Sequence, residues 1–288
     1  MKINLYKNTQ LFVNINLMII LSFFMFSSCD KTEVSQEIPS YISISEVKLN
    51  TTSNQGSNTH NITDVWLYVN DQARGVYPIP ANIPILQKDS TNIKIFAGIK
   101  DNGISNTRVR YSFYKMYEKD VVLVQDSIIE ILPTFYYTSN SNIDYENFEG
   151  VGTNIDTTLK SDIDFVVNTE NGNHFAEAIL DNENLIFECA TEEFENLPQV
   201  ASPVYLELDY KSNHIFTIGA YVNYPFLIEN RSLVHVSPKD EWNKIYINLT
   251  STVSSAIDNN SIKFYINMLR TDTTEDAWVK FDNLKIVY

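Results

Sequence analysis

The chain has 288 residues and a formal net charge of −15, with 36 acidic residues against 21 lysines and arginines. A surface this acidic repels phosphate backbones, so the composition argues against nucleic-acid binding. The two cysteines, Cys29 and Cys189, and four scattered histidines have no spacing that suits a zinc or haem site.

The first 28 residues have the parts of an export signal. Lys2 and Lys7 make the start of the chain positive, and an apolar run follows over residues 11–26. This run is interrupted by polar residues and is too short for a comfortable membrane span of about 20 residues. The small residues Ser27 and Ser28 then directly precede Cys29.

This ending resembles the lipobox of bacterial lipoproteins, although Phe26 stands where leucine is usual. The resemblance implies that signal peptidase II removes residues 1–28 and that Cys29 carries the lipid, palmitate among its acyl chains. Each buried methylene contributes about 0.8 kcal/mol, so two or more chains anchor a protein far better than one. We expect a protein held to a membrane outside the cytoplasm; the alternative is an ordinary secretory leader with an incidental cysteine.

The chain after Cys29 predicts a tether followed by β structure. Residues 29–40 are mostly polar and are expected to form a flexible tether. From there on, apolar residues alternate with a period of two between turn residues, and helical periodicity is nearly absent. We predict an all-β protein with two β-sandwich domains, 41–138 and 139–288, separated at the Ser/Asn-rich stretch 138–142.

The first predicted domain opens with a strand over 41–49. Farther on, Val65, Leu67 and Val69 should face the core before a hairpin turn at 70–73. Residues 65–81 resemble the core of a PEGA-type module, without the usual glycine before its second strand. Residues 98–103 and 111–114 resemble the N-terminal part of uncharacterised Bacteroidota lipoproteins. These resemblances imply a small immunoglobulin-like or PEGA-like module for spacing or surface display.

The second predicted domain is similar to the jelly-roll carbohydrate-binding-like domains of bacterial glycan-processing proteins. The similar pieces are Asn147-Phe148-Glu149, residues 241–249 and residues 281–286, in that order. In many such domains an early glutamate and the aspartate of the last strand bind structural calcium, which implies Glu149 and Asp282 here. Calcium takes six to eight oxygen ligands. The alternative is that both carboxylates bond nearby backbone or face solvent.

Sugar binding would need exposed aromatic rings, and the second domain offers several. Most aromatic residues on alternating strands pack in cores or at edges, so no ligand-binding residue is assigned. The candidates are Tyr205, Tyr221, Tyr224, Phe226, Trp242, Tyr246 and Trp278. Cys189, in an apolar stretch, is expected to be a buried strand residue.

Catalysis has weak support in the sequence. Glycoside hydrolysis uses two carboxylates across a cleft, and chance explains the close pairs in so acidic a chain. These pairs are Glu192 with Glu193, Asp162 with Asp164, and Glu207 with Asp209. No Gly-x-Ser-x-Gly, His-Glu-x-x-His or phosphate-binding glycine loop is present. We therefore expect a protein that is not an enzyme.

The prediction is a lipid-anchored outer-membrane protein of the Bacteroidota type whose jelly roll binds glycan or another surface component. Its expected partners are the membrane, through the lipid, and a polysaccharide or an envelope protein. One alternative is a structural or assembly lipoprotein that contacts a surface or secretion complex. Another is a glycoside hydrolase or lyase. The sequence does not indicate which side of the outer membrane the protein faces. Structural Ca²⁺ is the one cofactor that the resemblance implies.

Overall fold

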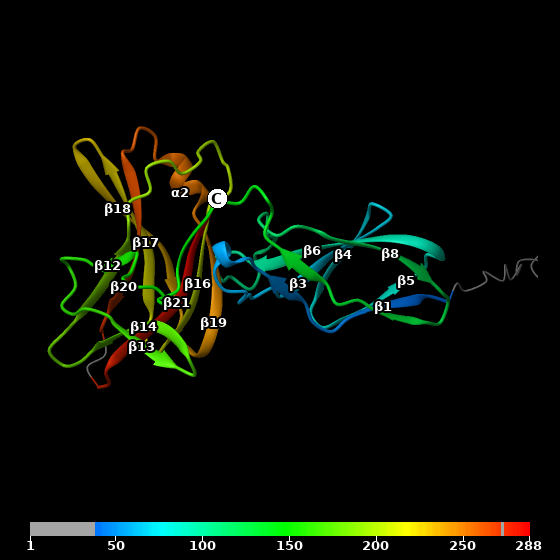
Figure 1. The fold of residues 1–288 in the computed structure, drawn as a ribbon, viewed down its shortest axis with the longest axis horizontal. Coiled ribbons are helices and arrows are strands. Elements are labelled where there is room, and N and C mark those ends of the chain that lie inside the picture. The colour runs from blue at the N-terminus through cyan, green and yellow to red at the C-terminus, as the bar shows by residue number, and fades with distance from the viewer. Residues whose placement is uncertain (1–37, 272–273) are drawn as a thin grey trace, which may run out of the picture. The chain divides into compact units, whose positions relative to one another are not determined.

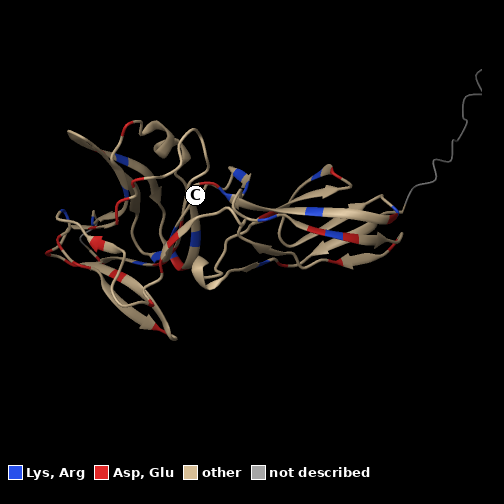
Figure 2. Ribbon diagram, turned by 45° about the horizontal axis from the view of Figure 1, so that its top comes forward, with Lys and Arg blue, Asp and Glu red and all other residues tan. Residues whose placement is uncertain are grey.

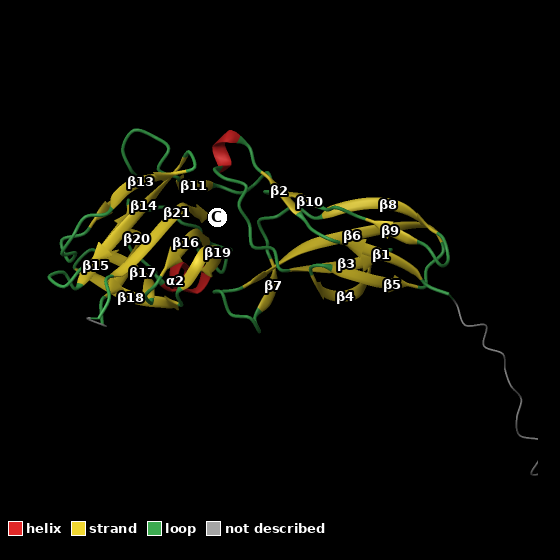
Figure 3. Ribbon diagram, turned by 90° about the horizontal axis from the view of Figure 1, so that it is seen from below, coloured by secondary structure: helices red, strands yellow, loops and turns green. Residues whose placement is uncertain are grey.

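The computed structural model describes residues 38–271 and 274–288 (Figure 1). The predicted signal peptide, Cys29 and nearly all of the predicted tether lie outside these ranges. Residues Pro39–Tyr288 form one compact unit. Strands dominate it, as Figure 3 shows, and its short helices are η1 (Ser53–Gln55) and α2 (Thr250–Ser255). Neither of these described helices is long and apolar enough to cross a membrane.

The first group of strands belongs to residues 40–136. A five-stranded sheet has the order β4-β3-β6-β7, with β8 pairing the first half of β6; smaller sheets are β5-β1-β9 and β10-β2. The strands are β1 (Ser40–Ile44), β2 (Lys48–Asn50), β3 (Asp64–Val69), β4 (Gln72–Pro78), β5 (Ala81–Ile85), β6 (Asp89–Lys100), β7 (Arg108–Arg110), β8 (Tyr117–Leu123), β9 (Ile128–Glu130) and β10 (Thr134–Tyr136).

These sheets enclose one hydrophobic core, which makes the first sandwich. Val65, Leu67 and Val69 of β3 are fully buried in it, as their alternation predicts. The single strand expected over 41–49 is wrong, because β1 and β2 are separate strands that pair in different sheets. The likeness to a PEGA-type module stays a prediction, as do the domain boundaries.

The second sandwich has a jelly-roll arrangement of two antiparallel sheets. One sheet has the order β13-β14-β21-β16-β19, with β11 beside β21; we call it the β16 sheet. The other is β12-β15-β20-β17-β18. The strands are β11 (Ile143–Glu146), β12 (Ile155–Thr157), β13 (Val166–Glu170), β14 (Asn173–Leu180), β15 (Ile186–Thr191), β16 (Tyr205–Ser212), β17 (Phe216–Tyr224), β18 (Leu227–Val236), β19 (Lys239–Asn248), β20 (Ser261–Leu269) and β21 (Ala277–Val287). The all-β prediction is thus confirmed.

The core between these sheets contains the alternating apolar residues that the sequence predicts, among them Leu206, Leu208 and Phe264. Cys189 is also buried there, as expected. The opposite face of β16 is not exposed to water, however. Tyr205 and Glu207, which alternate with the core residues, are 7% and 0% exposed.

Glu207 is buried because tyrosines of the first sandwich cover it. The Tyr111 hydroxyl donates to Glu207 Oε1 at 2.7 Å, and the Tyr137 hydroxyl lies 2.9 Å from both carboxylate oxygens. Lys244 of β19 completes the surroundings, with its Nζ 3.4 Å from Glu207 Oε2. A buried charge needs such partners, since an unpaired one is costly.

Aromatic rings pack around this carboxylate. The Tyr111 ring lies 5.1 Å from Tyr205 and 5.0 Å from Tyr246, and the Tyr114 and Tyr246 hydroxyls are 3.1 Å apart. We call Glu207 with Tyr111, Tyr114, Tyr137, Tyr205 and Tyr246 the tyrosine junction. It joins the two sandwiches through buried hydrogen bonds and ring contacts.

Charged residues are otherwise dispersed. Figure 2 shows acidic residues on both sandwiches and no single acidic block. This agrees with the even spread of Asp and Glu along the sequence.

Candidate functional site

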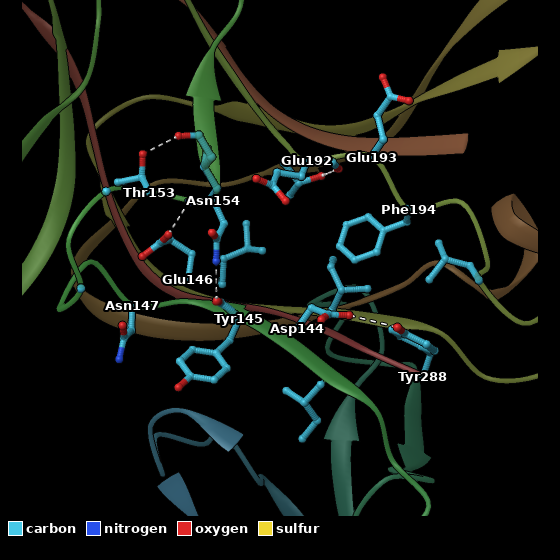
Figure 4. Close-up of a pocket in the computed structure, with 18 of the residues that line it drawn as sticks. Asp144, Tyr145, Glu146, Asn147, Thr153, Asn154, Glu192, Glu193, Phe194 and Tyr288 are labelled. Atoms are coloured by element: carbon cyan, nitrogen blue, oxygen red, sulfur yellow. Dashed lines mark hydrogen bonds between the residues drawn. The ribbon is translucent and has the colours of Figure 1, made fainter. Parts of the chain in front are cut away.

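The candidate site is a cavity of about 890 Å³ in the second sandwich (Figure 4). One side is the loop over residues 147–154, which joins β11 to β12. The other is the segment 192–197 after β15, and the end of β21 contributes further residues. We call this cavity the loop pocket.

Glu146 fixes the loop that forms one side. Glu146 is 7% exposed. Oε1 accepts a hydrogen bond from the Phe148 amide and Oε2 one from the Asn154 amide, both at 2.6 Å. One side chain therefore holds both ends of the loop. Charge-assisted bonds of this kind are about twice as strong as neutral ones, so the pocket is preformed.

Phe194 provides an aromatic ring inside the pocket. Its backbone exchanges two hydrogen bonds with Ile262, each 2.9 Å long, and its ring lies 5.9 Å from the ring of Phe264 in the core. In Figure 4 the Phe194 ring lies between Glu192 and Glu193 on one side and Asp144 and Tyr288 on the other. The ring is only partly buried, so it offers an apolar contact among polar groups.

Hydrogen-bonding groups surround that ring. The Tyr288 hydroxyl donates to Asp144 Oδ2 at 3.0 Å; burial and this carboxylate raise the tyrosine pKa. Glu193 accepts from the Ser261 hydroxyl at 2.7 Å, and Lys263 Nζ lies 3.5 Å from its other oxygen. Several lining carboxylates and amides are exposed, so they can bond to ligand hydroxyl groups.

The charge of the pocket limits what it can bind. The lining has no lysine, arginine or histidine among the described residues, and five of its side chains are carboxylates: Asp144, Glu146, Glu192, Glu193 and Glu195. Such a lining repels anions. A hydroxyl-rich ligand with an apolar face and no negative charge suits it.

The two residues implied for calcium both accept hydrogen bonds from protein groups. Glu149 accepts hydrogen bonds from the His174 amide at 2.8 Å and from His174 Nδ1 at 2.7 Å, and these bonds lower its pKa. Asp282 accepts from Asn173 and Asn283. Across 38–271 and 274–288 there is no group of three or more His, Cys, Asp or Glu that could hold a metal ion. Calcium binding by Glu149 and Asp282 stays a prediction.

The other sequence candidates are distributed over the second sandwich. Tyr205 and Tyr246 pack in the tyrosine junction, where no sugar can reach them. The Tyr221 hydroxyl donates to Glu188 at 2.8 Å, while Trp242 is 40% exposed. Phe226 is fully exposed at the β17–β18 hairpin.

The three candidate carboxylate pairs lie in different parts of the second sandwich. Glu207 is enclosed in the tyrosine junction. Asp162 accepts two backbone amide bonds, at 2.8 Å each, which lower its pKa. Of the pairs, only Glu192 with Glu193 lies at the loop pocket.

Sequence reasoning missed Phe194, Glu146, Asp144 and Tyr288. They come from three distant segments that are brought together by pairing of β12 with β15 and of β11 with β21. No local motif marks any of them.

The comparisons with known proteins give structural neighbours only. Neither protein-family models nor curated protein sequences gave a match. A family 11 carbohydrate-binding module from Clostridium thermocellum, in complex with a β-1,3-1,4-mixed-linked tetrasaccharide, has 11% identity and a TM-score of 0.36, over 51% of this chain and 94% of that one.

Two other solved structures are similar at the same level. The CBM22-1–GH10 modules of a Clostridium thermocellum xylanase, complexed with xylohexaose, have 11% identity and a TM-score of 0.38, over 50% of this chain and 28% of that one. A mutant family 29 carbohydrate-binding module complexed with cellulohexaose has 12% identity and a TM-score of 0.35, over 52% and 93%. Similarity at this level assigns no role to any residue of this chain.

Proposed function

We propose that this chain is a lipid-anchored, non-enzymatic protein of the cell envelope that binds a neutral carbohydrate in the loop pocket. The observation that carries the binding part is the Phe194 ring, fixed in a preformed cavity of about 890 Å³ among hydrogen-bonding groups. No cationic side chain is among the described residues that line this cavity. A sugar ring has an apolar face and a rim of hydroxyls, so it matches both kinds of contact.

The binding test is affinity electrophoresis of the full mature chain in gels that contain a neutral β-glucan, xylan, galactomannan or, as the anionic comparison, polygalacturonate. We expect retardation by a neutral polysaccharide and none by polygalacturonate. Phe194→Ala should weaken binding at least tenfold, which corresponds to about 1.4 kcal/mol. Phe226→Ala is the matched control, because Phe226 is fully exposed and lies outside the pocket.

Two results would overturn the proposal, the first its binding part and the second its non-enzymatic part. One is unchanged retardation of a folded Phe194→Ala variant. The other is release of reducing ends from the bound polysaccharide that stops on Glu192→Gln substitution, since this would make the protein a hydrolase. Capture of a stable envelope protein without any glycan binding would favour the assembly alternative.

The anchoring part is supported by the sequence that ends at Cys29. Metabolic labelling with an alkyne fatty acid should mark the wild-type chain and not the Cys29→Ser variant. Labelling of both would refute attachment at this cysteine. Protease treatment of intact cells would show whether the sandwiches face the exterior.

A further inference from the structure

A second cavity lies on the outer face of the β16 sheet and has a volume of about 690 Å³. Its lining combines residues of both sandwiches. Asn58, Thr59 and His60 come from the segment between β2 and β3, and β14, β16, β19 and β21 supply most of the rest. We call it the Trp242 pocket.

Trp242 of β19 provides its aromatic wall. Trp242 is 40% exposed, and its indole packs edge-to-face on Phe175, with ring centroids 5.5 Å apart. Phe175 is 3% exposed, so it is a fixed support. A rigid, half-exposed indole beside a cavity offers a flat apolar surface at low cost in conformational entropy.

The floor consists of buried, oriented polar groups. Asp282 is 3% exposed. Its Oδ2 accepts from Asn173 Nδ2 and Asn283 Nδ2, both at 2.9 Å, and its Oδ1 accepts the Asn283 amide at 2.6 Å. Because each carboxylate oxygen has two lone pairs, Oδ1 keeps capacity for one further donor.

Asp209 and Lys244 extend this floor toward the first sandwich. Asn283 Nδ2 also donates to Asp209 Oδ2 at 2.9 Å, and the Thr59 hydroxyl donates to the same oxygen at 2.6 Å. Lys244 Nζ lies 3.3 Å from Asp209 Oδ1. Thr59 thus attaches the first sandwich directly to the floor.

Two buried carboxylates lie side by side in this floor, because Asn283 Nδ2 bonds to Asp282 Oδ2 and to Asp209 Oδ2. A buried carboxylate is costly unless donors surround it. A ligand hydroxyl that donated to Asp282 Oδ1 would add such a donor.

We propose that the Trp242 pocket is a second carbohydrate site, in which a pyranose ring stacks on Trp242 and a hydroxyl group donates to Asp282. This site is separate from the loop pocket. Since Thr59 and His60 belong to its wall, it is complete only when the two sandwiches are joined. A sugar bound there stabilises their contact, because a ligand of the folded state raises its stability.

The test uses the full mature chain and four variants: Phe194→Ala, Trp242→Ala, Trp242→Phe and Asp282→Asn. A glycan array first identifies bound sugars, and calorimetric titration then measures their affinity. We expect Phe194→Ala to retain at least one sugar. Trp242→Ala should weaken that binding at least tenfold, Trp242→Phe should restore part of it, and Asp282→Asn should weaken it severalfold.

The outcomes separate the two sites. If folded Trp242→Ala binds every sugar as the wild type does, the second site is refuted. If Phe194→Ala abolishes all binding, the second site is refuted and the loop pocket is supported. If Trp242→Ala alone abolishes binding, the second site stands and the loop pocket fails. The sugar that Phe194→Ala still binds should raise the melting temperature of that variant and should not raise that of Trp242→Ala. This result would support a pocket that residues of both sandwiches line.

Discussion

Replacement of Tyr137 by phenylalanine tests the tyrosine junction directly. Tyr137 is 5% exposed, and its hydroxyl bonds to both oxygens of Glu207 at 2.9 Å and lies 3.3 Å from Lys285 Nζ. The substitution removes only the hydroxyl. A hydrogen bond to a charged group contributes about 1.5–3 kcal/mol. Glu207 keeps Tyr111 and Lys244, so we expect a loss of about 2 kcal/mol of unfolding free energy.

Urea and thermal unfolding of the mature chain, followed by circular dichroism, measure this loss. For a unit of this size, about 2 kcal/mol lowers the melting temperature by roughly 4–8 °C. Tyr136→Phe is the matched control, because Tyr136 is 50% exposed and its hydroxyl has only a 3.4 Å contact with Asn50. We expect the control to change stability by less than about 0.5 kcal/mol. Equal effects of the two variants would refute the assigned role of the junction.

Three further predictions concern buried groups. Burial raises the thiol pKa of Cys189, so in a Cys29→Ser variant a maleimide should react only after denaturation. Labelling of the folded variant would contradict this. In Gly219→Ala the new Cβ would clash with the Tyr265 ring, so we expect a loss of about 1–3 kcal/mol of unfolding free energy in urea titrations. Gly150→Ala is the control, because Gly150 has open space around it, and it should leave the unfolding free energy nearly unchanged. Burial lowers the pKa of Lys285 from 10.5 to about 8. Between pH 8 and pH 9 the unfolded chain therefore binds more protons at this residue, so Lys285 raises the unfolding free energy over this interval. Lys285→Met should remove that contribution, and the same change in unfolding free energy between pH 8 and pH 9 in the wild type and the variant would contradict the assignment.

The fold was largely predictable because alternation reports which side chains face a core. Leu206, Leu208 and their neighbours show a period of two, and the structure buries them as predicted. The same pattern could not show that Glu207 is buried as well. A polar residue between core residues normally faces water, and its partner Tyr111 is 96 positions away in the sequence.

The candidate sites were less predictable for the same reason. Phe194 follows two glutamates and is not part of an alternating apolar pattern, so nothing in the sequence around it marks it. Glu146 bonds to the amides of Phe148 and Asn154, and no sequence motif predicts these bonds. Trp242 is one of the aromatic candidates in the sequence, but the floor below it depends on Thr59, which lies 150 positions from Asp209. Side-chain chemistry is visible in a sequence, whereas convergence of distant segments is set by strand pairing.

The tyrosine junction has a mechanical consequence for the proposed anchored protein. The segment 138–142 alone would let the sandwiches swivel, but the buried bonds to Glu207 resist rotation about that connection. A pull between a sugar held in the loop pocket and the chain before Ser40 would therefore load these side chains as well as the backbone. Under tension the two sandwiches would therefore move as one rigid unit and would not reorient independently.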